Sequence, residues 1–236
     1  MYCQFCGSAM STETEFCAQC GKQAPSAGAS AAGSIGSQIK ASSKDAASVL
    51  KQLLKDPVGG LAVAYATLGN QRAMSAGLVL CLAFALAAAG GITMGAGRWF
   101  GQLYRLTGGA MSGPGSFSGF LQLALQFFVI PAAIAAVGYG IRRVVGASPP
   151  LAADVFTAGA ALAPLGLATL LAGLLGVGNL EVILVLILVA VSYLVLMLFS
   201  GFTRAGGMTE TAGAPAVPVS ILLAGWLASV VFRAMW

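Results

Sequence analysis

Long apolar stretches alternate with short polar segments over most of the chain. Five of these stretches have about twenty residues or more, enough for a helix to cross the hydrocarbon core of a bilayer. The second and third contain Pro131 and Pro164, which neighbouring helices in a bundle tolerate. The pattern predicts an all-α membrane protein with a five-span transmembrane helix bundle over residues 73–236. The predicted spans are residues 73–95, 119–141, 153–176, 181–202 and 216–234.

Two shorter amphipathic helices are predicted over residues 42–72, before the first span. In residues 42–55, apolar side chains recur at helical spacing opposite three lysines, after a capping-box-like start at Ser42 and Asp45. Such a helix lies either in the membrane interface on anionic lipid or against the protein's own cytoplasmic side, and both alternatives stay open. Asp56-Pro57 ends it and begins a second helix, with Asp56 as the cap and Pro57 at the first helical position. That second helix carries an apolar stripe of Val58, Leu61, Tyr65 and Leu68 and ends near Gly69-Asn70.

Composition excludes most soluble proteins and most enzymes. Of the 236 residues, 58% are hydrophobic and 8% are charged, whereas soluble domains have about 45–50% and about 25%. The chain contains no histidine, so no imidazole can act as a catalytic base or metal ligand. The spans carry neither paired acids nor a nucleophile with a base, and no phosphate-binding loop is present. We therefore do not expect an enzyme.

Four of the five cysteines form two knuckles near the N-terminus, Cys3-Gln-Phe-Cys6-Gly and Cys17-Ala-Gln-Cys20-Gly. Two Cys-x-x-Cys turns together supply the four thiolates of a tetrahedral Zn²⁺ shell. Cys3, Cys6, Cys17 and Cys20 are therefore the predicted metal ligands. The shell is closed, so the zinc is structural and not catalytic. Redox dithiols and disulfides are the alternatives, but a thioredoxin-type motif needs one knuckle in a larger α/β domain.

The knuckles define a small zinc ribbon over residues 1–22, similar to the short ribbons at the N-terminus of many bacterial membrane proteins. So few residues build no core of their own, so the metal would supply most of the folding energy. Residues 23–41 are rich in Gly, Ser and Ala and are predicted to form a flexible linker. Cys81 lies in an apolar run and is expected to be a small core residue.

The distribution of Lys and Arg predicts the orientation. With the N-terminus in the cytoplasm, six basic residues of the head, two of the second loop and one of the fourth give nine inside and three outside. The positive-inside rule therefore favours a cytoplasmic N-terminus and an external C-terminus. A four-thiolate site also persists best in a reducing compartment. The loop residues counted inside are Arg142, Arg143 and Arg204, and those counted outside are Arg98, Arg105 and Arg233.

Small residues recur every four positions in three spans, which allows close helix packing. Packing between the spans of one chain is favoured over a dimer face, and a homo-oligomer stays open as the alternative. These stripes are Ala132, Ala136 and Gly140 in the second span, Gly159 and Ala163 in the third, and Gly225 and Ser229 in the fifth.

Residues 50–236 resemble the Yip family of five-span membrane proteins. The matching features are the Asp56-Pro57 lead-in, the order of the spans and the tight turn at residues 177–180. They also include Gly146-Ala-Ser followed by Leu151, Asp154 and Ala163-Pro164. A ribbon joined to such a bundle is typical of the bacterial branch, which implies a bacterial inner membrane. The Asp-Leu-Tyr-Gly-Pro stretch of the Rab-binding eukaryotic members is absent here, so GTPase binding is not carried over.

The favoured function is a non-enzymatic membrane adaptor or scaffold whose ribbon binds a cytoplasmic protein. The alternative is a transporter or channel for an uncharged small solute, because ion transport usually needs ionisable groups inside the spans. Asp154 and Glu181 are expected at solvated span ends. Nucleic acid is not an expected partner, since the ribbon has Lys22 alone against Glu13 and Glu15.

Overall fold

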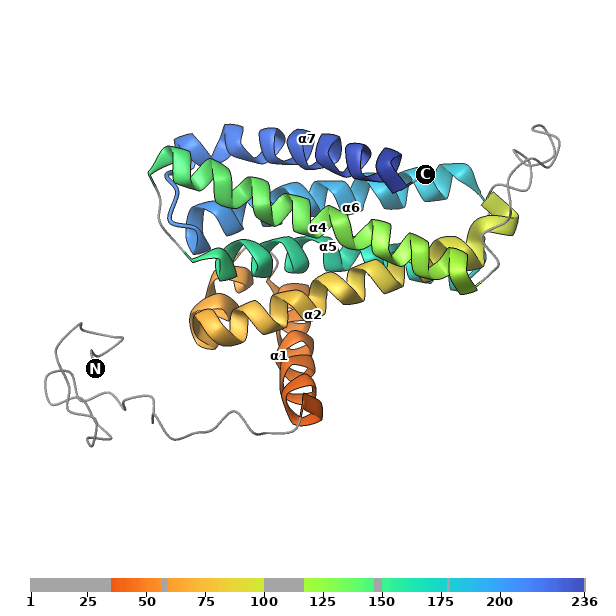
Figure 1. Cartoon of the computed structure of the whole chain (residues 1–236), viewed down its shortest axis with the longest axis horizontal. Coiled ribbons are helices and arrows are strands. Elements are labelled where there is room, and N and C mark those ends of the chain that lie inside the picture. Colours follow the sequence, from red (N-terminus) through yellow and green to blue (C-terminus); the bar gives the residue numbers. More distant parts are fainter. Residues whose placement is uncertain (1–34, 57–58, 100–116, 147–149, 178, 236) are drawn as a thin grey trace, which may run out of the picture. The chain divides into compact units, whose positions relative to one another are not determined.

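A computed structural model describes residues 35–56, 59–99, 117–146, 150–177 and 179–235, which are helical apart from short turns (Figure 1). The chain divides into two compact units, residues 1–40 and 41–236, and the packing below concerns the second. The helices are α1 (Ile35–Lys55), α2 (Gly60–Trp99), α4 (Phe117–Val145), α5 (Leu151–Leu174), α6 (Leu180–Ser200), the π-helix η1 (Gly201–Ala205) and α7 (Glu210–Met235).

The five predicted spans are confirmed as helices. Within the described residues, five helices are long and apolar enough to cross a membrane, namely α2, α4, α5, α6 with η1, and α7. The α6 span has the highest mean hydropathy, 3.2, and is the least buried of the five. Large apolar side chains such as Val185 and Leu188 are exposed on it. These faces are suited to contact with lipid, and the chain is an integral membrane protein.

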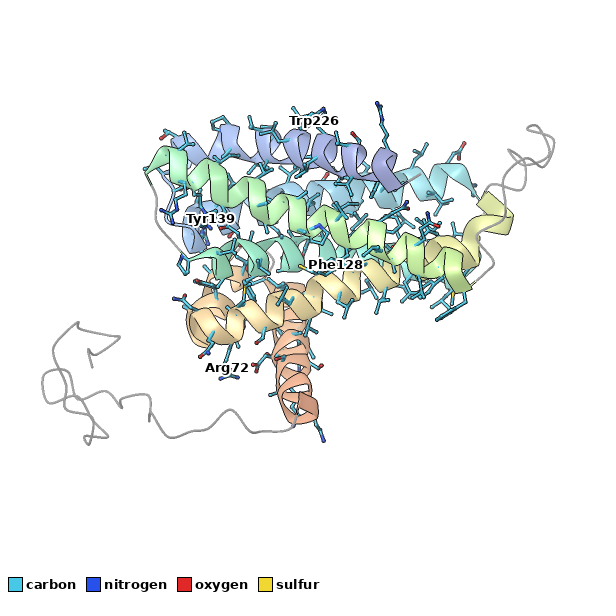
Figure 2. All side chains as sticks on the ribbon, viewed as in Figure 1. Arg72, Phe128, Tyr139 and Trp226 are labelled. Carbon is cyan, nitrogen blue, oxygen red and sulfur yellow. The ribbon has the colours of Figure 1, made fainter. Side chains whose placement is uncertain are left out.

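The first amphipathic helix begins at Ile35 rather than at Ser42. Ser42 therefore lies inside α1, and the predicted capping-box start is wrong. No proline stands between the two positions to end the helix. Asp45 instead binds α2, because Arg72 Nε donates to Asp45 Oδ2 over 3.0 Å and Arg72 Nη2 donates to Oδ1 over 2.6 Å. Figure 2 shows Arg72 on the side of α2 that α1 crosses.

The apolar stripe of α1 packs on the protein itself. Ala46, Val49 and Leu53 are 5%, 2% and 1% exposed and belong to the main hydrophobic core. Lys51 and Lys55 lie exposed on the same helix. Of the two alternatives for this helix, the structure therefore has its apolar face against the bundle, and α1 crosses the bundle helices rather than running along them (Figure 1).

The second amphipathic helix forms the start of α2 and ends where it was predicted to end. Gly69 has a φ of 68°, which interrupts the helical backbone and is a conformation that favours glycine. Asp56 Oδ1 accepts a hydrogen bond from Gly59 N over 2.8 Å, which confirms Asp56 as the capping residue. Leu61 is fully buried, as its stripe predicts.

The most extensive contact between the described helices joins α2 and α5. A Cβ added at Gly77 would lie 2.7 Å from Phe156 Cα, and one at Gly159 would lie 2.6 Å from the Gly77 carbonyl oxygen. Farther along both helices, Cβ atoms added at Gly91 and Gly173 would overlap the backbone of the opposite helix. The residue numbers at the contacts increase in the same direction along both helices, so α2 and α5 are parallel. We call this contact the α2–α5 glycine seam; its members are Gly77, Phe84 and Gly91 on α2 and Gly159, Gly166 and Gly173 on α5.

The small-residue stripes differ in where they face. Gly159 belongs to the α2–α5 glycine seam, so packing within the chain is confirmed there. The stripe that contains Ala132, Ala136 and Gly140 is exposed instead, and a Cβ added at Gly140 or Gly225 would meet nothing within 4 Å. Packing within the chain was thus the wrong prediction for these positions, because spacing shows which residues share a face but not which face turns inward.

Two adjacent glycines of α2 test the seam. Gly91→Ala would place a methyl group on the Thr169 carbonyl oxygen, and we expect it to lower the free energy of unfolding in detergent micelles by about 1–3 kcal/mol. In Gly90→Ala the new methyl group would lie 3.6 Å from Leu170 Cδ1, an ordinary contact, so this control should leave stability unchanged or higher. Equal stability of the two variants would contradict the described seam.

Candidate functional site

An ion pair is buried where α4 ends and α5 begins. Arg142 lies in the last turn of α4, and Asp154 lies in the first turn of α5. Arg142 Nη2 pairs with Asp154 Oδ2, and the two side chains are 2% and 1% exposed. The cation is at a helix C-terminus and the anion at a helix N-terminus, so each charge also has a favourable interaction with its own helix dipole.

The burial of this pair corrects two expectations. Asp154 was predicted to be a solvated charge at a span end, and Arg142 was assigned to a loop. In the structure α4 continues to Val145, and residues 152–162 of α5 are all buried, so Asp154 does not reach solvent. Glu181 does lie exposed at the start of α6, as expected, and the Asn179 side chain accepts from its backbone N–H over 2.9 Å.

The neighbouring arginine has a different environment. Arg143 is exposed, and its Nη2 and Nε donate to the Tyr139 hydroxyl over 2.6 and 3.0 Å. Its guanidinium carbon also lies 5.2 Å from the centre of the Tyr139 ring, a cation–π contact. Figure 2 labels Tyr139 near this end of α4. Tyr139 therefore binds the outward arginine, and Arg142, one residue earlier, points into the bundle.

Glycines of α4 and of the π-helix region make room for the two charges. A Cβ added at Gly206, just after η1, would lie 2.6 Å from Arg142 Nη1. One added at Gly138 would lie 3.1 Å from Asp154 Oδ1 and 3.0 Å from the Phe202 ring. Gly201 contacts Thr157 of α5 in the same way. The π-helix and the glycine that follows it therefore lie beside the ion pair, and π-helices occur frequently at functional sites.

Hydrogen bonding of the pair is incomplete. Arg142 Nε and Asp154 Oδ1 have no hydrogen-bond partner among the described residues. Buried charges are costly unless they are paired and fully hydrogen-bonded, and ionisable residues inside a membrane bundle usually mark a functional position. The pair holds the joined ends of α4 and α5 together. It contains no nucleophile or general base of the kind that a hydrolytic site requires.

Two hydroxyl side chains of the spans are bonded within their own helices. Thr169 Oγ1 donates to the Gly166 carbonyl oxygen over 2.8 Å, and Ser192 Oγ donates to the Leu188 carbonyl oxygen over 2.8 Å. Cys81 is buried, with its Sγ 3.8 Å from the Val155 carbonyl oxygen, which confirms it as a core residue. These three groups therefore do not form a polar path across the bundle.

The predicted zinc ligands Cys3, Cys6, Cys17 and Cys20 lie outside the described residues, so the zinc site stays a prediction. Within the part of the chain that the structure describes, no group of three or more Cys, Asp or Glu side chains is placed to hold a metal ion.

Comparisons with protein-family models, with curated proteins and with solved structures give no match. The resemblance to the Yip family stays a prediction.

The loss of stability when Arg142 is left without its counter-charge tests the ion pair. We expect Asp154→Leu to lower the free energy of unfolding by about 3–5 kcal/mol, because Arg142 would stay buried without a counter-charge. The double variant Arg142→Met/Asp154→Leu should recover most of that loss. Unfolding in mixed micelles measures both, and a double variant no more stable than the single one would contradict the pairing.

Proposed function

We propose that the protein is a non-enzymatic membrane adaptor of the Yip type, in which the helix bundle anchors a cytoplasmic zinc ribbon that binds another protein. The doubled Cys-x-x-Cys-Gly motif carries the proposal. A closed four-thiolate shell stabilises a small folded module and leaves no coordination position for catalysis. The Gly/Ser/Ala-rich segment that follows the ribbon favours a tether that lets it reach a partner.

The described bundle supports a role as an anchor. Its first and third spans are joined by backbone contact along the α2–α5 glycine seam. Its buried charges, Arg142 and Asp154, are paired with each other. A bundle held in this way can anchor a docking module. The excess of basic residues on one side favours a cytoplasmic N-terminus, and the resemblance to the bacterial branch of the Yip family favours a bacterial inner membrane.

Co-purification from membranes in mild detergent tests the adaptor. We compare the intact chain with Cys17→Ser/Cys20→Ser, which removes half of the thiolate shell. Cys81→Ala is the matched control, because it removes a buried core thiol away from the ribbon. We expect the double variant to lose both its zinc and at least one cytoplasmic partner, with expression unchanged, while the control keeps both.

Identical partner lists for the intact chain and the double variant would contradict docking by the ribbon. If the double variant loses its zinc but keeps every partner, the zinc site serves only the folding of the ribbon. The search for a function would then move to the bundle.

A second candidate, passage of an uncharged solute, is favoured by the buried ion pair against the π-helix. Intramembrane charges and π-helices both occur at functional positions. Light scattering by liposomes that contain the protein, exposed to a glycerol or urea gradient, measures this passage. The adaptor proposal predicts permeability equal to that of empty liposomes. Permeability above that level, lost in Arg142→Met/Asp154→Leu, would assign transport to the bundle instead.

A further inference from the structure

The beginning of α2, residues 60–68, is a short helix that Gly69 separates from the rest of the span. Gly69 has a φ of 68° and a ψ of 171°, a backbone conformation that is essentially confined to glycine. It is exposed, and a Cβ added there would meet nothing within 4 Å, so its surroundings leave the backbone room to turn. We call residues 60–68 the lid and Gly69 its hinge.

One side chain of the lid, Tyr65, lies beside the buried ion pair. The side chains of Tyr65 and Arg142 are close enough to interact electrostatically. The centre of the Tyr65 ring also lies 5.8 Å from that of Phe156, which follows Asp154 by two positions. Phe156 is fully buried, whereas Tyr65 is partly exposed. Tyr65 therefore lies at the solvent-facing edge of the ion-pair site.

A hydrogen bond at the surface helps to keep the lid closed. The Tyr65 hydroxyl donates to Asn70 Oδ1 over 2.7 Å, and this bond joins the two sides of the Gly69 hinge. Leu61 and Ala64 of the lid are buried and belong to the hydrophobic core. Closure thus rests on apolar packing along the lid and on one exposed hydrogen bond across its hinge.

The closed arrangement has a cost at the ion pair. Arg142 Nε and Asp154 Oδ1 have no hydrogen-bond partner among the described residues, and a buried polar atom without a partner is unfavourable. Water that reached the pair would supply a partner to each atom. Loss of the apolar packing of the lid therefore opposes opening, whereas hydration of these two atoms favours it.

We propose that the lid opens at Gly69 and admits water to the Arg142–Asp154 pair. In the closed state, which the structure represents, both side chains are buried. In the open state, water accepts a hydrogen bond from Arg142 Nε and donates one to Asp154 Oδ1. The lid thus controls the hydration of the buried charges, and this role rests neither on the zinc ribbon nor on passage of a solute.

Hydroxyl-radical footprinting of the full-length protein in lipid nanodiscs measures the opening. Radicals oxidise the side chains that water reaches, and mass spectrometry gives the oxidation rate of each. Phe156 is the reporter, because it is 0% exposed and its ring contacts that of Tyr65. Phe117, which is 76% exposed at the other end of α4, corrects for the radical dose in the same sample.

Two variants remove the hydrogen bond across the hinge. Tyr65→Phe and Asn70→Ala should each raise the oxidation rate of Phe156 about two- to ten-fold, the change expected for one lost hydrogen bond. The double variant should add nothing further, because both changes remove the same bond. Gln71→Ala truncates the neighbouring exposed residue and should match the parent.

Two glycines test the hinge itself. A Cβ added at Gly69 or at Gly140 would meet nothing within 4 Å, so alanine causes a clash at neither position. Gly69 has a positive φ, whereas Gly140 lies inside α4. We expect Gly69→Ala to raise the oxidation rate of Phe156, because the closed backbone suits glycine alone, and Gly140→Ala to leave that rate unchanged.

Removal of the charges tests what drives the opening. Arg142→Met/Asp154→Leu removes both atoms that lack a partner, so water gains no hydrogen bond to the pair when the lid opens. We expect Phe156 to be oxidised more slowly in this variant than in the parent. A lid that opens independently of the charges would give the same rate in both chains.

Two results would overturn the proposal. Equal oxidation of Phe156 in the parent, Asn70→Ala and Gly69→Ala would exclude movement at the hinge. Equal oxidation in the parent and in Arg142→Met/Asp154→Leu would exclude the role of the ion pair. Only variants that elute as a single species with parental helix content are compared. Because Asn70 is exposed, Asn70→Ala still tests the hinge if a variant at Tyr65 or Gly69 does not fold.

Discussion

Backbone contact between α2 and α5 is the constraint on which the rest of the bundle depends. In hydrocarbon, helices gain little from burying apolar side chains, because lipid is equally apolar, so association relies on close packing. Glycines 77, 91, 159 and 173 let the two backbones meet. The helix α5 packs against α2, α4 and η1. Residues 152–162 of α5 are therefore all buried. Asp154 is therefore held away from water, and a buried carboxylate in that position requires the partner that Arg142 provides.

The number of spans, their approximate ends and the break at Gly69 could be predicted from the sequence, because length, hydropathy and turn chemistry determine them. The inward faces could not. In water the buried face of a helix is apolar and the other is polar, whereas both faces of these spans are apolar. Ala132, Ala136 and Gly140 recur every four residues, and the seam glycines Gly159, Gly166 and Gly173 recur every seven. Both spacings keep residues on one face of a helix, yet only the seam meets another helix. Only knowledge of the opposing helix distinguishes them.

The sequence contains a sign of the ion pair, but the location of both charges at span ends suggested solvated residues instead. Opposite charges stand at the joined ends of two consecutive spans, Arg142-Arg143 before the turn and Asp154 after it. A charge at a span end is usually solvated, and that expectation held for Glu181. It failed for Asp154 because the rotation of α4 turns one arginine inward while Tyr139 binds the other outside. The four cysteines, by contrast, are predicted as zinc ligands from their spacing alone, and that site stays a prediction.

An apolar groove whose walls include Pro164 and Ala168 of α5 and Ala190 of α6 lies on the face of α5 opposite the α2–α5 glycine seam. Pro164 and Ala168 each lie two positions from Gly166, and at about 100° per residue this places them on the far side of α5 from its glycines. The glycine face gives α5 a partner without any side chain between the backbones. The Pro164 face leaves α5 and α6 poorly matched, and α6 is the least buried span.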